Sequence, residues 1–87
     1  MKIVFLRQAH RFIKKADQPL KEKNREEVLK IGKNPMTGES LTGKLKHLRP
    51  HHFSFVRIQY RIAYEVRNDI IIVVIGTREN FYRDLVE

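Results

Sequence analysis

The chain has 87 residues and carries 18 lysines and arginines against 10 aspartates and glutamates, which gives it a net charge of +8. A chain this short buries one small core, so residues 1–87 are expected to form a single domain. The absence of cysteine excludes disulfides, thiolate catalysis and cysteine-based zinc sites, and the positive charge favours a nucleic acid, an anionic membrane or an acidic protein as partner.

The first part of the chain predicts a short strand followed by a helix. Residues 2–6 are expected to form a short β-strand. From there the apolar residues follow a helical period, which predicts a first helix with one apolar face. The residues of this face are Leu6, Ala9, Phe12, Ile13 and Ala16.

A second helix is expected over residues 21–30. Asp17 supplies a capping side chain, and Pro19 stands near the first helical position. Gly32 and Pro35 are expected to end the helix. Its thin apolar face contains Leu20, Val28, Leu29 and Ile31. We expect the two helices to form an antiparallel pair that lies across a sheet.

The second half of the chain predicts strands. Residues 34–43 are rich in turn-forming residues and connect it to the helical half. Residues 45–48 predict a short strand or a loop, and alternating apolar residues then predict two strands. The first contains Phe53, Phe55 and Ile58, and the second contains Tyr60, Ile62, Tyr64 and Val66.

Asn68 and Asp69 predict a turn before the last strand. Residues 70–75 are an unbroken run of isoleucine and valine, which is typical of a central strand buried on both faces. Gly76 is expected to close this strand. Residues 78–86 are expected to form a loop with one or two helical turns.

The order of these segments resembles the RelE/ParE superfamily, the small toxins of bacterial type II toxin-antitoxin systems. The most specific matches are the YRIAY segment at residues 60–64 and the IGTR segment at residues 75–78, followed four residues later by Tyr82. The resemblance covers nearly the whole chain. It implies an α+β fold in which an N-terminal helical hairpin packs on a small, twisted, mainly antiparallel β-sheet, as in microbial ribonucleases.

The resemblance also implies an activity. RelE-like toxins resemble ribosome-dependent endoribonucleases that cleave mRNA in the decoding site, whereas ParE-like toxins inhibit DNA gyrase. We expect the first activity, in which the 2′-hydroxyl of the RNA attacks the adjacent phosphate, so that no metal or other cofactor is needed. The implied partners are a cognate antitoxin, mRNA and the 16S rRNA of the ribosome, with DNA contacted only through an antitoxin complex.

Three residues match the family's site. Arg61 matches an arginine of the YRIAY strand whose planar fork suits two phosphate oxygens. Arg78 matches an arginine near the leaving group, where its permanent charge suits transition-state stabilisation. Tyr82 matches a late tyrosine that stacks on an mRNA base. The alternatives are that Arg61 pairs with Glu65 or is solvated at the sheet edge, and that Tyr82 rather than Phe81 packs in the core.

The proton acceptor departs from the best-known RelE pattern. His52 and Ser54 stand at the two positions where that pattern carries lysines. An imidazole titrates near neutrality, so His52, or its neighbour His51, is a candidate to accept the proton of the 2′-hydroxyl. The alternative is that both histidines belong to a polar loop after Pro50.

A basic series just before and within the strand region is expected to follow the phosphates of mRNA or ribosomal RNA. This series, with the neighbouring histidine, is Lys44, Lys46, Arg49, His51 and Arg57. The basic cluster of the helical half fits ribosomal RNA, ion pairs with nearby glutamates or an acidic antitoxin. No metal site is expected, because His10 and His47 are scattered and no acidic residue stands at a ligand spacing from them.

No apolar run reaches the roughly 18 residues of a membrane-spanning helix, and no signal-peptide pattern follows Met1. We therefore expect a cytoplasmic protein without membrane contact. Two other functions stay open at this point, a ParE-like gyrase inhibitor without nuclease activity and a basic accessory protein that only binds nucleic acid.

Overall fold

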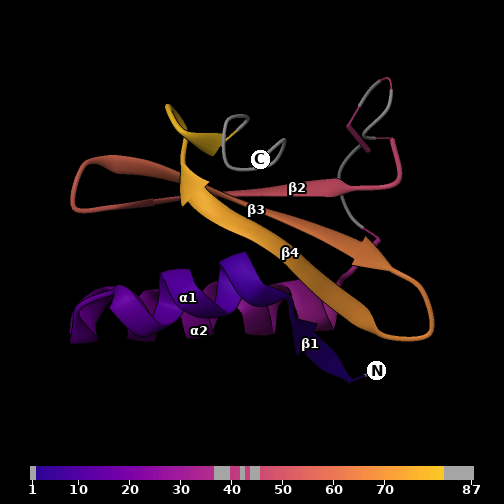
Figure 1. The fold of residues 1–87 in the computed structure, drawn as a ribbon, viewed down its shortest axis with the longest axis horizontal. Helices are drawn as coiled ribbons and strands as arrows, with labels where there is room; N and C mark the ends of the chain where they lie inside the picture. The colour runs from indigo at the N-terminus through magenta and orange to yellow at the C-terminus, as the bar shows by residue number, and fades with distance from the viewer. Residues whose placement is uncertain (1, 37–39, 42, 44–45, 82–87) are drawn as a thin grey trace.

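The computed structural model describes residues 2–36, 40–41, 43 and 46–81. Among these residues the elements follow the order β1 (Ile3–Phe5), α1 (Arg7–Lys15), α2 (Gln18–Lys33), β2 (Arg49–Phe55), β3 (Ile58–Val66) and β4 (Ile70–Thr77). The strands form one sheet in the order β1-β4-β3-β2, and both helices lie against one face of it (Figure 1). The expected α+β fold, with a helical hairpin packed on a sheet, is confirmed.

The sheet is mainly antiparallel. β2 pairs with β3 and β3 pairs with β4 in antiparallel register, whereas β1 runs parallel to β4. β4 therefore lies between two strands, as its unbroken apolar run predicts.

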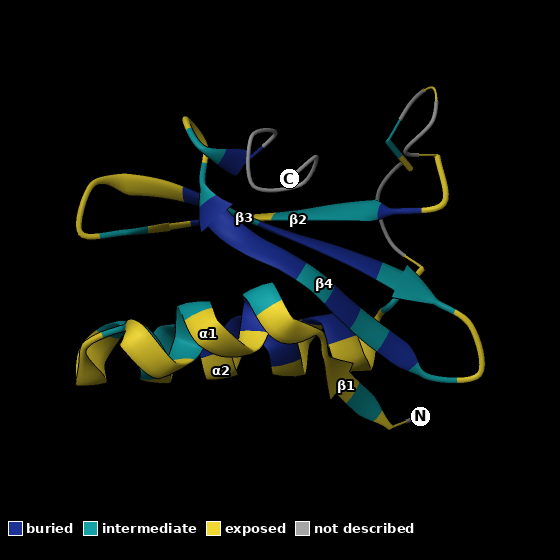
Figure 2. Cartoon of the chain, viewed as in Figure 1, coloured by how far each residue is buried: buried dark blue, intermediate teal, exposed yellow. Residues whose placement is uncertain are grey.

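The main core lies between the helices and the sheet (Figure 2). Ala9 of α1 and Val28 and Ile31 of α2 pack there against alternate residues of the strands. These strand residues are Phe53, Tyr60, Ile62, Tyr64, Ile70, Ile72 and Ile75. Burial of this apolar surface drives folding, and it fixes which face of β2 and β3 the helices cover.

A second, smaller cluster lies apart from this core. It joins Leu48, Ala63, Val74 and Phe81, and Phe81 is completely buried. Ala63 and Val74 are partners across β3 and β4, so they project from the same face of the sheet. The segment after β4 therefore returns over this face.

The side chain of Gln8 completes the edge of β4 where β1 ends. Its Nε2 donates to the carbonyl oxygen of Ile75, and its Oε1 accepts from the Ile75 N–H, both at 2.9 Å. β1 pairs only with the stretch from Ile70 to Ile72. An amide side chain thus satisfies main-chain groups of β4 that β1 does not reach, and it ties the first turn of α1 to the sheet.

Helix α2 is longer than its sequence pattern predicts. Asp17 caps it by accepting a hydrogen bond from the N–H of Leu20 at 3.0 Å, so the helix begins at Gln18. At its other end the helix passes through Gly32. A glycine weakens a helix but still permits it, whereas Pro35 lacks the N–H that a continuing helix needs.

The buried face of α2 also differs from the prediction. Leu29, expected on the apolar face, is 53% exposed. The buried residues are Asn24, Glu27, Val28 and Ile31. Two polar side chains thus occupy the buried stripe, which explains why the apolar pattern of this helix looks thin.

The β2–β3 hairpin was predicted wrongly. Ile58 belongs to β3, because the chain turns at Val56 and Arg57. These two residues have positive φ angles of 50° and 65°. Neither residue type favours such a turn, so the sequence carried no turn signal at this point.

Three other boundaries also bear on the prediction. β4 runs past Gly76 to Thr77. Leu48 directly precedes β2, while Leu45 of the expected strand or loop at 45–48 lies outside the described residues. The segment after β4 is described only as far as Phe81.

Replacement of Gln8 by alanine is expected to lower the free energy of unfolding by about 1–3 kcal/mol, because the partly buried N–H and C=O of Ile75 lose their partner. Urea denaturation followed by circular dichroism measures this loss. Gln18→Ala is the matched control, since the exposed Gln18 amide bonds only to Glu22 and its removal is expected to cost less than about 0.5 kcal/mol. Equal losses in both variants would contradict the role of Gln8.

Candidate active site

Strand pairing places His52 and Arg61 on the same face of the sheet. The two residues are direct partners across β2 and β3, and such partners project to the same side. Their neighbours Phe53, Tyr60 and Ile62 pack in the core beneath the helices. Because side chains alternate along a strand, His52 and Arg61 face away from the helices.

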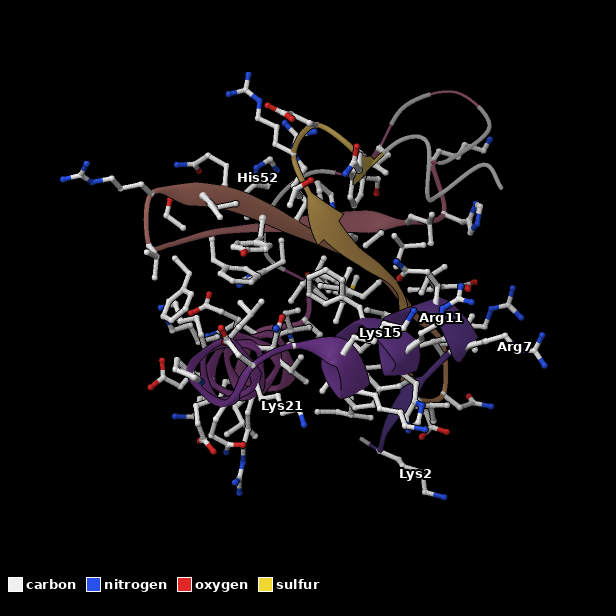
Figure 3. The ribbon with its side chains drawn as sticks, turned by 60° about the vertical axis from the view of Figure 1, so that its left-hand side comes forward. Lys2, Arg7, Arg11, Lys15, Lys21 and His52 are labelled. Atoms are coloured by element: carbon white, nitrogen blue, oxygen red, sulfur yellow. The ribbon has the colours of Figure 1, made fainter. Side chains whose placement is uncertain are left out.

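Arg78 joins them at the end of β4. Its N–H donates to the carbonyl oxygen of Gln59 at 2.9 Å, which continues the β3–β4 pairing one residue beyond Thr77. Gln59 stands two residues before Arg61 and shares its side of the sheet. We call the surface formed by His52, Arg61 and Arg78 the arginine face. Figure 3 shows His52 across the sheet from the labelled cations of α1.

Arg61 is held in place by an aromatic ring. The central carbon of its guanidinium lies 5.7 Å from the ring centroid of the buried Phe81, which is a cation–π contact. Glu65, considered as a partner for Arg61, forms an ion pair with Arg67. The second cluster of the core therefore also orients the central cation of the arginine face.

The surroundings of His52 favour its neutral imidazole. Partial burial is the largest cause that lowers the pKa of His52 below its usual 6.5, and the positive charges of Arg61, His51 and Arg78 lower it further. At pH 7 the ring is therefore unprotonated and able to accept a proton. The two arginines that would bind a phosphate group also keep His52 in its basic form.

The two adjacent histidines project to opposite sides of the sheet. His51 lies on the helix side, where its Nε2 is 2.8 Å from Oε1 of Glu27 in α2. Since successive side chains of a strand alternate, this contact agrees with the position of His52 beside Arg61. Of the two histidines considered as proton acceptor, only His52 lies on the arginine face.

Glu27 is the centre of a buried ionic group between α2 and β2. The residue is 3% exposed, and its carboxylate lies 3.2 Å from Lys23, 2.9 Å from Lys30 and 2.8 Å from His51. Burial by itself would raise the pKa of Glu27, but hydrogen bonds from Lys30, His51 and Lys23 outweigh it and lower this pKa from 4.5 to about 2. The carboxylate stays ionised at neutral pH and links α2 to β2.

The pairing of helical lysines with nearby glutamates is confirmed at Glu27, which contacts Lys23 and Lys30. Neither the burial of Glu27 nor the contact between Arg61 and Phe81 was predicted. A signal existed for Glu27, which stands on the same helical stripe as Asn24 and Ile31. The Phe81 contact had no such signal, because it depends on how the chain turns after β4.

The other predicted site residues that the structure describes lie on loops and strand ends. Lys46 is exposed, and Arg49 at the start of β2 donates to the carbonyl oxygen of Met36 at 3.4 Å. Arg57 stands at the tip of the β2–β3 hairpin. Lys44 and Tyr82 lie outside the described residues.

Two classes of feature are not found in the described part of the chain. No three His, Asp or Glu side chains come together there as a metal site would require. No helix among the described residues is both long and apolar enough to span a bilayer.

Protonation of Glu27 is expected to destabilise the protein in acid. A pKa lowered from 4.5 to about 2 contributes stability that is fully present above pH 4.5 and is lost as the pH falls towards 2. This shift corresponds to about 3 kcal/mol. Thermal unfolding followed as a function of pH measures the loss, and Glu27→Gln is expected to show a flatter dependence.

Glu26→Gln is the matched control for this measurement. Glu26 is exposed and lies 3.9 Å from Lys23, so the variant is expected to keep the parental pH dependence. If Glu27→Gln retained the whole loss in acid, the ionic group around Glu27 would not be its source.

Comparison with protein families agrees with this architecture. A family model described as the ParE-like toxin of type II bacterial toxin-antitoxin systems matches residues 3–86. Searches of curated proteins and of solved structures returned no match. The family match spans both helices and all the strands described above, and the chain therefore belongs to the ParE-like toxins of type II toxin-antitoxin systems.

Proposed function

We propose that this toxin is a metal-independent endoribonuclease that cleaves mRNA on the ribosome. One observation carries the proposal: His52, with its lowered pKa, shares one face of the sheet with Arg61 and Arg78. A proton acceptor beside two permanent cations provides what cleavage by the 2′-hydroxyl of RNA needs from a protein.

In the proposed reaction the 2′-hydroxyl oxygen attacks the adjacent phosphorus while His52 accepts its proton. The bond between phosphorus and the 5′-oxygen breaks, and the 5′-oxygen takes a proton from water. The products are a 2′,3′-cyclic phosphate and a 5′-hydroxyl. His52 then returns its proton to the solvent, so no water is consumed overall. Every bond to phosphorus that is made or broken belongs to the RNA, and the protein contributes proton transfer, charge and orientation.

The two arginines are assigned to the charge that develops on the phosphate. Arg61, oriented by Phe81, presents a planar fork to two phosphate oxygens. Arg78 is assigned to the charge on the leaving oxygen, because a guanidinium keeps its proton far above neutral pH. Tyr82 remains assigned to stacking on an mRNA base.

The proposed polyanionic partners are mRNA and the 16S rRNA of the decoding site, which places the activity in the cytoplasm. The net charge of +8 supports this assignment. The basic residues proposed to follow phosphates are Lys44, Lys46, Arg49 and Arg57. His51 is left out of this surface, because it contacts Glu27 on the other side of the sheet.

A type II toxin has a cognate antitoxin as its partner, and we assign the docking of that antitoxin to the helix side. A groove of about 360 Å³ lies there between β1, α1 and α2. Its lining combines Ile3, Phe5, Ile13, Val28 and Leu29 with His10, Lys21 and Arg25. An antitoxin segment with apolar residues and carboxylates would complement this lining.

The charge around the groove supports the same assignment. Residues 2–16 include five lysines and arginines and no aspartate or glutamate. Arg7 and Arg11 stand one turn apart along α1, on the side of the molecule away from His52 (Figure 3). With Lys14 they line a hollow that shares Phe5 and His10 with the groove. An acidic segment bound here would neutralise cations that repel one another in the free toxin.

A second candidate function is inhibition of DNA gyrase, which the ParE-like description of the matching family favours. A gyrase inhibitor needs a binding surface but no proton acceptor. On this reading the arginine face would be a contact surface, and the lowered pKa of His52 would have no catalytic consequence.

Arg61→Ala and Arg78→Ala are each expected to reduce mRNA cleavage by about 10²–10³-fold, because each removes a cation from the developing charge. Primer extension after brief expression locates breaks within translated frames, and circular dichroism checks that the variants fold. Arg67→Ala, in the turn between β3 and β4, is expected to cleave like the parent. Intact mRNA together with blocked gyrase supercoiling would select the second candidate.

His52 is expected to determine the pH dependence of cleavage. Only the neutral imidazole accepts a proton, so kcat/KM should rise with pH and level off with a midpoint below 6.5. His52→Ala is expected to lose this midpoint and about 10²–10⁴-fold in rate, measured with purified ribosomes carrying a defined mRNA. His51→Gln should keep the decrease of kcat/KM at low pH, because His51 faces Glu27 on the other side of the sheet. A parental rate in His52→Ala would eliminate His52 as the base.

A further inference from the structure

The β2–β3 hairpin turns through two residues that disfavour its geometry. Val56 has a φ of 50° and Arg57 a φ of 65°, as in a two-residue turn of type I′. A positive φ is uncommon outside glycine, asparagine and aspartate, and for a β-branched residue such as valine it is an outlier. The chain therefore holds backbone strain at this tip.

Folding alone does not explain these residue types. Asparagine followed by glycine is the pair that such turns favour, because both adopt positive φ at little cost. The chain uses glycine at another positive-φ position, Gly43. Strained backbone of this kind concentrates at functional sites, so the side chains at the tip are expected to have a role beyond the turn.

The tip also exposes apolar side chains. Val56 is 74% exposed and Ile58 is 45% exposed. The tip lies at the end of the sheet opposite the β3–β4 turn (Figure 1), and Figure 2 shows it exposed to solvent. We call Val56, Arg57 and Ile58 the hairpin tip.

A groove of about 510 Å³ opens beside the hairpin tip. β4 ends at Thr77, opposite Tyr60. Residues 57–59 extend past this end and line one side of the groove, and residues 78–80 line the other side. The groove is lined by the arginines Arg57 and Arg78, the amides Gln59 and Asn80 and the carboxylate Glu79. Arg78 belongs to the arginine face as well, so the groove adjoins the proposed phosphate site.

We propose that the hairpin tip and this groove form a subsite for the RNA nucleotide next to the scissile phosphate. The apolar tip contacts the face of a base, Arg57 binds the neighbouring phosphate, and the amides of Gln59 and Asn80 bond to the edge of the base. The subsite rests on the proposed function, because it receives the strand that the arginine face would cleave.

The chemistry of the groove favours RNA over a protein partner. Two guanidinium groups stand against the one carboxylate of Glu79 in its lining, which suits a strand with a phosphate at every nucleotide. Amide side chains both donate and accept hydrogen bonds, as the edges of unpaired bases do. The centres of protein contact surfaces are enriched in aromatic residues, whereas Ile58 is the apolar residue of this lining and no aromatic residue lines the groove.

A double variant, Val56→Asn with Arg57→Gly, separates folding from binding. We expect it to unfold at a temperature about 4–8 °C higher than the parent, because the turn strain is relieved. We also expect it to bind RNA at least about 10-fold more weakly. Fluorescence anisotropy with a labelled, single-stranded 2′-O-methyl RNA measures binding. This RNA lacks the attacking hydroxyl, so the result stays interpretable even if the toxin does not cleave RNA.

A pair of single variants tests the phosphate contact. Arg57→Gln and Arg67→Gln each remove one positive charge, from opposite ends of β3, and Arg67 pairs with Glu65 at its end. If Arg57 binds a phosphate, the slope of log affinity against log salt should become shallower by about 0.7 in Arg57→Gln. The slope of Arg67→Gln should stay parental.

Three results would overturn the subsite. The first is a double variant that is stabilised but binds the RNA with parental affinity. The second is a double variant that is less stable than the parent, because the turn at Val56 and Arg57 would then not be strained. The third is a loss of affinity for ribosomes or gyrase with unchanged affinity for the RNA, which would assign the hairpin tip to a protein contact. Equal salt slopes in the two single variants would remove Arg57 from the proposal.

Discussion

The contact between Glu27 and His51, together with the burial of Phe53, determines how strand β2 faces. Neighbouring side chains of a strand project to opposite sides, so fixing one residue fixes the next. A slip of β2 by one residue would pull His51 away from a buried carboxylate and turn His52 under the helices. The buried carboxylate of Glu27 would then lose one of the three hydrogen-bond partners that offset its burial. The orientation of His52 on the arginine face is therefore set by contacts on the other side of the sheet.

The two sides of the sheet have different roles. The helix side supplies most of the apolar burial and so most of the driving force for folding. The other side holds Arg61 and Arg78 near His52, and their positive charges add to the effect of burial in lowering the pKa of His52. The ring of Phe81 attracts the guanidinium of Arg61 and so offsets part of the repulsion between the cations on this side. The orientation of Arg61 and the stability of the protein thus both depend on the small cluster that contains Phe81.

Local sequence predicted the elements well and their limits less well. The alternation from Tyr60 to Val66 and the apolar run of β4 have strong periods, and both strands are confirmed. Ile58 was placed in the wrong strand, because Val56 and Arg57 are not turn residues and tertiary pairing imposes the turn. Local sequence also could not predict which of His51 and His52 faces away from the helices, because this depends on where α2 places the carboxylate of Glu27.

The parallel pairing of β1 with β4 joins the two ends of the sequence. Ile3 pairs with Ile70, and the side chain of Gln8 bonds to a main chain 67 residues away. Contacts so far apart form late, because the intervening chain must first be closed into a loop. A chain still being translated lacks the central strand and the arginine that follows it. The arginine face is therefore completed only after residue 78 has been synthesised, so this surface forms late in the folding of the chain.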